Sequence, residues 1–170
     1  MKMESVILVG MMGSGKSTVG RALADLLGVP FQDTDMMLEH RLGRPIPQLF
    51  ELYGEEAFRY HETSILKNLE PEGRVLATGG GIVLRSENWV EFTRLGRSVF
   101  LDVPVELLET RLDQSSRKRP LLQTENWETK LRDLYASRRP LYERADVRVE
   151  VDEQPIEVIA ERIRVALDGH

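Results

Sequence analysis

A glycine-rich loop near the N-terminus restricts what this chain can fold into. Residues 10–17 read Gly-Met-Met-Gly-Ser-Gly-Lys-Ser, between the apolar run Val6–Val9 and a segment of helical periodicity. Glycine allows backbone conformations that a Cβ forbids, so successive N–H groups of such a loop can point at phosphate oxygens. The N-terminus of the following helix adds to this anion site. The pattern therefore predicts a phosphate-binding P-loop rather than a simple glycine-rich turn.

The P-loop suggests a role for each residue that forms it. Lys16 is expected to reach the β- and γ-phosphates of a nucleotide from a solvent-facing loop, and the Ser17 hydroxyl to ligate Mg²⁺. P-loops also serve GTPases, motors and carriers, but no Asn-Lys-x-Asp run is present to read guanine, and the chain is too short for a motor. A small-molecule kinase is the leading class, with the nucleotide bound by Gly13, Ser14, Gly15, Lys16, Ser17 and Thr18.

Short apolar runs alternate with longer periodic segments, which is typical of α/β proteins with a parallel sheet covered on both faces. We expect strands at Val6–Val9, Pro30–Gln32, Arg74–Ala77, Ser98–Leu101 and Val147–Val151. The first helix should begin inside the P-loop and end at Gly28. Further helices are expected at Asp35–Leu42, Ile46–Tyr53, Gly54–Leu69, Ser86–Leu95, Val105–Arg111, Trp127–Glu143 and Pro155–Leu167.

Composition indicates one domain, residues 1–170, because 41% hydrophobic residues in a chain of this length suffice for a single core. The net charge of −5, without a basic stripe, argues against a nucleic-acid partner. The absence of cysteine excludes disulfides and thiolate metal sites. No cleavable apolar segment precedes the first strand, and no apolar run approaches the roughly 20 residues of a membrane span. We expect a cytoplasmic monomer without a membrane partner.

Two carboxylates, Asp33 and Asp35, follow the second expected strand. In an open α/β sheet, the carboxyl ends of the strands face the ligand crevice. Asp33 is placed to hold the water shell of the metal, and Asp35 to accept a hydrogen bond from a substrate hydroxyl. The alternative is that both residues only cap the next helix, as aspartate commonly does.

Glycines and arginines mark a second part of the predicted site. The triplet Gly79–Gly81 follows another expected strand, and because a turn needs only one or two glycines, it favours close contact between the backbone and a substrate. Arg59 lies three residues before Glu62, on the same helix face, so the carboxylate can orient the guanidinium. An exposed surface ion pair would give the same pattern.

Residues 113–126 are polar and lack apolar periodicity, which predicts an exposed lid, with a disordered connector as the alternative. A kinase needs cations over the migrating phosphoryl group, and a carboxylated substrate needs the planar fork of an arginine. Arg117, Lys118 and Arg119 in the lid are candidates for the first task, and Arg138 and its neighbour Arg139 for the second. The alternative for each group is a solvated face.

Taken in order, GMMGSGKSTVG, DTD, GEEAFR-x-x-E, TGGGIV, RPLL and RRPLYE-x-AD resemble the shikimate kinase family over essentially the whole chain. The resemblance implies phosphorylation of the 3-hydroxyl of shikimate, with ATP as co-substrate and Mg²⁺ as cofactor. It also implies a nucleoside-monophosphate-kinase-like P-loop kinase fold, which is a three-layer sandwich around a five-stranded parallel sheet of order 2-3-1-4-5. A substrate-binding insert is implied at about residues 35–62, and a mobile lid at about 113–126.

The resemblance also assigns residue roles. Lys16, Asp35 and Arg119 match the residues of catalysis, and Ser17 and Asp33 match those of the metal site. The adenine is expected between an arginine near Arg111 and the backbone around Pro155. Glu62 matches the residue that supports Arg59, and the apolar wall of the substrate site matches Ile46, Phe50 and Phe58. Shikimate is expected to contact Asp35, Arg59, Gly79, Gly80, Gly81 and Arg138.

Two other functions stay open: a gluconate-type kinase on the same fold, and a non-catalytic nucleotide-binding regulator. Paired arginines with a glycine triplet favour a carboxylated polyol as substrate over a nucleobase. The intact set of P-loop, metal and lid residues argues against a regulator that has lost turnover.

Overall fold

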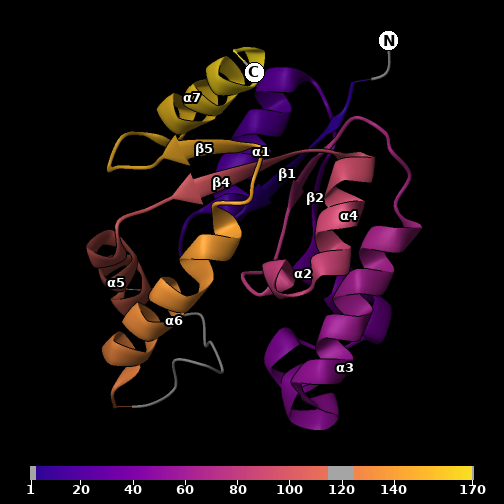
Figure 1. Ribbon diagram of the computed structural model, residues 1–170, viewed down its shortest axis with the longest axis vertical. Coiled ribbons are helices and arrows are strands. Elements are labelled where there is room, and N and C mark those ends of the chain that lie inside the picture. The colour runs from indigo at the N-terminus through magenta and orange to yellow at the C-terminus, as the bar shows by residue number, and fades with distance from the viewer. Residues whose placement is uncertain (1–2, 115–124, 170) are drawn as a thin grey trace.

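The computed structural model describes residues 3–114 and 125–169. Its strands form one parallel sheet of order β2-β3-β1-β4-β5, which confirms the expected architecture (Figure 1). The strands are β1 (Ser5–Val9), β2 (Phe31–Asp33), β3 (Val75–Ala77), β4 (Gly96–Asp102) and β5 (Val147–Glu150). The helices are α1 (Lys16–Leu27), α2 (Thr34–Leu42), α3 (Ile46–Asn68), η1 (Ile82–Leu84), α4 (Ser86–Leu95), α5 (Val105–Asp113), α6 (Trp127–Tyr142) and α7 (Ile156–Asp168).

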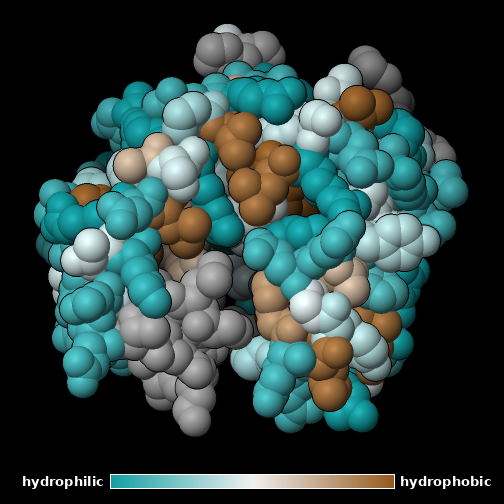
Figure 2. Space-filling model, turned by 60° about the horizontal axis from the view of Figure 1, so that its bottom comes forward, coloured by the Kyte–Doolittle hydropathy of each residue, from teal (hydrophilic) through white to brown (hydrophobic). Residues whose placement is uncertain are grey.

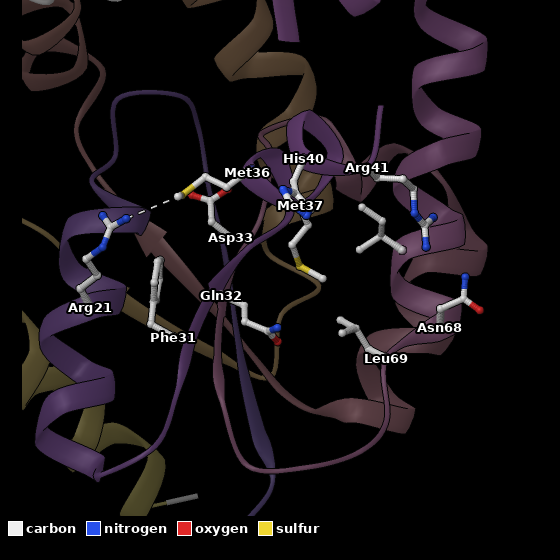
Figure 3. A pocket seen from close by; sticks show the side chains of 11 residues that line it. Arg21, Phe31, Gln32, Asp33, Met36, Met37, His40, Arg41, Asn68 and Leu69 are labelled. Atoms are coloured by element: carbon white, nitrogen blue, oxygen red, sulfur yellow. Dashed lines mark hydrogen bonds between the residues drawn. The ribbon is translucent and has the colours of Figure 1, made fainter. Parts of the chain in front are cut away.

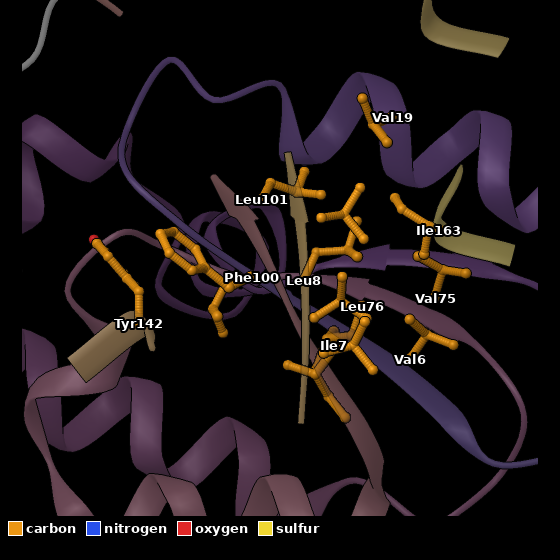
Figure 4. Close-up of a cluster of buried hydrophobic side chains, with 14 of the residues drawn as sticks. Val6, Ile7, Leu8, Val19, Val75, Leu76, Phe100, Leu101, Tyr142 and Ile163 are labelled. Atoms are coloured by element: carbon orange, nitrogen blue, oxygen red, sulfur yellow. The ribbon is translucent and has the colours of Figure 1, made fainter. Parts of the chain in front are cut away.

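Helices cover both faces of the sheet, so its central strand is buried on both sides. Helices α1 and α7 pack together on one face, and α4 and α6 lie on the other (Figure 1). In Figure 4, Ile7 and Leu8 of β1 lie between Ile163 of α7 and the stacked rings of Phe100 and Tyr142, whose centroids are 5.3 Å apart. This burial accounts for the continuous apolar run of β1. It also anchors the P-loop, which leaves the sheet at the end of that strand.

Helices α2 and α3 share a small hydrophobic cluster of their own, made of Leu38, Leu49, Phe58 and Ile65. Helix α3 is interrupted at Gly54, which has φ 80° and ψ 171°. The sequence predicts a boundary between two helices at this residue, and the left-handed φ explains why glycine stands there. The cluster gives α2 and α3 a core beside the main one, and all of its residues except Ile65 lie in the substrate-binding insert, about 35–62, that the family resemblance implies.

At the majority of helix and strand ends, the observed bound lies one or two residues from the predicted bound. Strand β4 begins at Gly96, two residues before the predicted Ser98. The short helix η1 after the glycine triplet is not predicted, because three residues carry no measurable periodicity. Within the described residues, no helix combines the length and apolarity that a membrane crossing needs.

Candidate active site

The P-loop connects β1 to α1 and has the backbone that its glycines suggest. Gly10, Gly13 and Gly15 have φ of 154°, 80° and 89°. Gly15 is the N-cap of α1, so Lys16, Ser17 and Thr18 form the first turn of that helix. The N–H groups of this turn are available to an anion because a helix leaves its first donors unpaired.

The expectation that Lys16 is part of a solvent-facing loop is wrong for this residue. Its side chain is buried, with the residue 9% exposed, and Nζ donates to the carbonyl of Met11 at 2.9 Å and also to that of Gly10. The loop curls around the ammonium group, which satisfies two of its carbonyls. Lys16 therefore stabilises the loop in addition to carrying a positive charge at its centre.

Asp33 joins the P-loop to helix α2. Its Oδ2 accepts a hydrogen bond from Ser17 Oγ, while Oδ1 accepts from the N–H groups of Asp35 at 2.9 Å and Met36 at 3.3 Å. The capping role raised for Asp33 is therefore confirmed for one oxygen, while the other oxygen faces Ser17 of the P-loop, and its role toward a metal stays a prediction. Among the described residues no cluster of three or more histidine or acidic side chains could hold a metal. Mg²⁺ suits such a sparse site because it commonly keeps waters and binds phosphates alongside one or two protein oxygens.

A pocket of about 610 Å³ lies beside Asp33, between β2 and the helices that flank it. Figure 3 shows Phe31 and Met37 at this pocket, with Arg21 Nη2 3.6 Å from Met36 Sδ at one side. Of the described residues, those of the glycine triplet and the two predicted substrate arginines are not among its lining. The pocket is therefore separate from the predicted shikimate site.

Arg59 is held by two carboxylates of its own helix. Its Nη1 donates to Glu62 Oε1 at 2.7 Å, and Nη2 to Glu55 Oε1 at 3.3 Å. The guanidinium carbon lies 5.7 and 5.3 Å from the ring centroids of Phe50 and Phe58. Arg59 is 8% exposed, so this is not the exposed surface pair that the spacing left open.

Side chains of α2 and α3 fill the space that the absence of side chains at Gly79 and Gly81 leaves. A Cβ on Gly81 would lie 2.2 Å from Arg59 Nη2. A Cβ on Gly79 would lie 2.8 Å from Asp35 Oδ1 and 2.9 Å from Glu62 Oε2. A side chain at either position would displace Asp35, Glu62 or Arg59, so close approach of α2 and α3 accounts for glycine at these two positions.

Gly80 links the triplet to the P-loop and to α6. A Cβ at this position would lie 3.4 Å from Arg138 Nη1 and 3.5 Å from the backbone nitrogen of Met12. Arg138 is 4% exposed. The structure thus brings the predicted substrate arginines, the glycine triplet and Asp35 together next to the P-loop.

Arg139 points elsewhere. It makes two hydrogen bonds of 2.8 Å to the carboxylate of Asp102, at the end of β4, and pairs with Glu143 at 2.9 Å. These contacts give it a structural role on the outer side of α6. Of the two neighbouring candidates, only Arg138 lies at the glycine triplet.

Two polar residues of the site are missed by sequence reasoning. Thr34 is fully buried, and its Oγ1 accepts a hydrogen bond from the N–H of Gly79 at 3.2 Å. Tyr142 Oη donates to the carbonyl of Gly80 at 2.6 Å. Thr34 lies in the DTD motif and Tyr142 in the RRPLYE motif. Membership of these motifs is the one feature of the sequence that points to the two residues. Together they fix the backbone of the triplet.

Glu62 is the buried acid of the site. Its side chain has no exposed surface, and burial raises its pKa from 4.5 to about 7 against the opposing attraction of Arg59. The charge of Asp35 raises this pKa further, and that of Arg138 lowers it. Near neutral pH the carboxyl group is therefore poised between its two protonation states.

Of the two residues predicted to bind adenine, Arg111 contacts the P-loop. Arg111 Nη1 donates to the carbonyl of Gly13 at 3.2 Å, so α5 brings this arginine onto the loop. Pro155 is exposed and is the N-cap of α7. Most of the predicted lid, about 113–126, and with it Arg119, lies outside the described residues.

Figure 2 turns the end with α3 and α6 forward and shows hydrophobic residues near the middle of a mostly hydrophilic face.

Comparisons with known proteins agree with this geometry. A family model described as Shikimate kinase matches residues 12–168. A shikimate kinase of Synechococcus elongatus is 46% identical over 161 residues, which cover 93% of this chain and 83% of that protein. A solved structure of shikimate kinase from Acinetobacter baumannii in complex with shikimate is 42% identical, with a TM-score of 0.92 and coverage of 98% and 94% of the two chains. A gluconokinase from Sinorhizobium meliloti, at 22% identity over 97% and 94% of the chains and a TM-score of 0.61, shares the fold. By its sequence and its structure, this chain belongs to the shikimate kinase family.

Proposed function

We propose that this protein transfers the γ-phosphoryl group of ATP to the 3-hydroxyl of shikimate, with Mg²⁺ bound at Ser17 and Asp33. One observation carries the proposal. Arg59 and Arg138, from two different helices, are both buried beside a glycine segment whose Gly80 would bring a Cβ within 3.5 Å of the P-loop backbone. A carboxylate bound by the arginines would therefore lie next to the phosphates of the nucleotide.

Each residue of the proposed site has a role that suits its chemistry. Two guanidinium groups bind the substrate carboxylate, because a planar fork matches the two oxygens. Asp35 accepts a hydrogen bond from the acceptor hydroxyl and aims it at the γ-phosphorus. Lys16 turns from the loop carbonyls to the phosphates when a nucleotide binds. Mg²⁺, when bound, neutralises charge on the phosphate oxygens.

Phosphoryl transfer depends on positioning and charge neutralisation more than on covalent chemistry. The lid at about 113–126 is proposed to add Arg119 to the positive charge and to keep water from acting as the acceptor. Adenine is proposed to bind between Arg111 and the backbone near Pro155. The insert at about 35–62 and the lid are proposed to be parts of a single domain. The protein is proposed to act as a cytoplasmic monomer.

The test is ADP release in a coupled assay with shikimate, with gluconate and with neither. We expect turnover that requires both shikimate and Mg²⁺. Equal ADP release with and without shikimate would contradict the proposal and point to a nucleotide-binding regulator with residual hydrolysis. Turnover on gluconate alone would assign the chain to the rival kinase, which the family membership does not favour.

A further inference from the structure

Glu62 has one carboxylate oxygen that no contact explains. Oε1 accepts the hydrogen bond from Arg59, but Oε2 is buried and has no hydrogen-bond partner among the described residues. Oε2 and Asp35 Oδ1 lie 2.9 and 2.8 Å from the position that a Cβ on Gly79 would take. Two carboxylate oxygens, from α2 and α3, therefore face the same small space beside the glycine triplet.

The charged groups around Glu62 come from three helices. Arg59, with its second partner Glu55, belongs to α3, and Asp35 belongs to α2. Helix α6 contributes Arg138 and the buried hydroxyl of Tyr142, whose pKa is raised by burial against the attraction of Arg138. The Glu55 side chain is 55% exposed, so water screens its charge. Among the described residues, two guanidinium groups thus already face the buried carboxyl group of Glu62 and the half-buried carboxylate of Asp35 before any substrate arrives.

A carboxylated substrate adds a third negative charge to this space. Like charges that lie close together in a buried site disfavour ionisation. The carboxylate that is most easily protonated therefore takes up a proton. Of the protein carboxylates that face the space, Glu62 is the one without exposed surface. Oε2 has no hydrogen-bond partner among the described residues and borders the same space as Asp35 Oδ1, so it is placed to carry a proton directed toward Asp35.

We propose that shikimate binds together with one proton from solvent, which the carboxyl group of Glu62 holds on Oε2. In the complex, neutral Glu62 donates toward Asp35 and still accepts from Arg59 through Oε1, so the charge of both arginines is left to the substrate carboxylate. Glu62 is in this view a positioning residue, since it acts through Arg59 and Asp35. The inference rests on the proposed function, because the third charge is that of shikimate.

A measurable pH dependence follows. In the free protein burial already raises the pKa of Glu62 to about 7, and a bound carboxylate raises it further. Above this pH the free carboxyl group is ionised while the complex keeps the proton. Shikimate affinity should then fall with rising pH, approaching tenfold per unit.

The experiment is calorimetric titration of shikimate into the protein near pH 8, in buffers whose ionisation enthalpies differ. We expect the apparent binding enthalpy to vary with buffer by an amount equal to uptake of about one proton, and Kd to rise up to about tenfold from pH 7.5 to 8.5. Shikimate does not supply this proton, since a carboxylic acid of ordinary pKa near 4 is fully ionised there. Glu62→Gln keeps the shape and the acceptor for Arg59, and should bind without proton uptake and with a flat pH profile.

Glu55→Gln is the matched control, because it removes the exposed carboxylate from the same arginine and should keep the proton uptake. A wild-type enthalpy that does not vary with buffer overturns the inference, and so does uptake that persists in Glu62→Gln. Should that variant fail to fold, a flat wild-type Kd above pH 7 still overturns it. Shikimate that binds and is phosphorylated without proton uptake leaves the proposed function standing. A lack of any shikimate binding overturns both.

Discussion

Neighbouring residues can serve unrelated purposes when a helix turns one toward a site and the other away. Arg138 lies at the glycine triplet, while Arg139, one position on, is bound to Asp102 by two hydrogen bonds of 2.8 Å. Successive residues of an α-helix point about 100° apart, since 3.6 residues complete a turn. One guanidinium thus lies at the glycine triplet, where we propose that it binds the substrate, and the next joins α6 to the end of β4.

This difference predicts opposite effects of the same substitution. Arg138→Lys should weaken shikimate binding by about ten- to a hundredfold, because an ammonium cannot reproduce the guanidinium fork. Arg139→Lys should leave shikimate affinity nearly unchanged and lower the melting temperature instead. Titration with shikimate and thermal unfolding of both variants separate the two roles. Affinity lost in Arg139→Lys and kept in Arg138→Lys would show that the assignment is reversed.

Asp35 either takes the proton of the acceptor hydroxyl or only aims it. We expect Asp35→Asn to lower kcat by at least about 10²-fold at saturating shikimate, because an amide keeps the shape but cannot accept the proton. Steady-state kinetics and a separate measurement of Kd distinguish the possibilities. A raised KM with nearly unchanged kcat would leave Asp35 with positioning alone.

At the scale of elements, the segment between β3 and η1 is the point where three helices meet. Thr34 of α2 and Tyr142 of α6 each bond to its backbone, and the guanidinium of Arg59 occupies the place of a Gly81 side chain. The catalytic geometry therefore depends on how closely these helices approach the glycines. A change at a glycine acts on the helices that surround it.

Gly81→Ala should displace Arg59, because the new Cβ would lie 2.2 Å from Nη2. We expect KM for shikimate to rise at least about tenfold, as loss of a charge-assisted hydrogen bond implies. Gly169→Ala is a control in which the new Cβ meets its nearest atom at an ordinary 3.6 Å, and its kinetics should match those of the wild type. An unchanged KM in Gly81→Ala would mean that Arg59 does not bind the substrate.

For the whole molecule, one buried carboxyl group links the site to stability. Because the folded state raises the pKa of Glu62 from 4.5 to about 7, it holds a proton that the unfolded chain has released in this range. The favourable contribution of the neutral group is complete below pH 4.5 and is lost as pH rises through about 7. Burial of Glu62 in the site thus lowers the free energy of unfolding at higher pH.

Chemical unfolding at several pH values tests this contribution. The free energy of unfolding of the wild type, relative to Glu62→Gln, should fall by up to about 3 kcal/mol between pH 4.5 and 7.5. The comparison with the variant removes the effect of other titrating groups. A difference that stays constant over this range would mean that folding does not raise the pKa of Glu62.

The pattern of local residues was enough to predict the elements of this fold and the nature of its first loop. A run such as Val6–Val9 indicates burial on both faces, and glycines before a lysine indicate a phosphate loop. Both patterns can be recognised because they depend on residues that are near in sequence. The break of α3 at Gly54 was predicted for the same reason. The order of the strands came with the family resemblance, and the structure confirms it.

Tertiary packing alone decided how the site is arranged. The hydrogen bond from Tyr142 to Gly80 spans 62 positions, and no periodicity within either segment reports it. The burial of Lys16 and the approach of Glu62 to Asp35 likewise depend on how a loop curls and how two helices dock. Sequence spacing sets the face of an element on which a side chain lies, whereas the partner of that side chain, and with it the pKa of Glu62, is set by contacts between elements far apart in the chain.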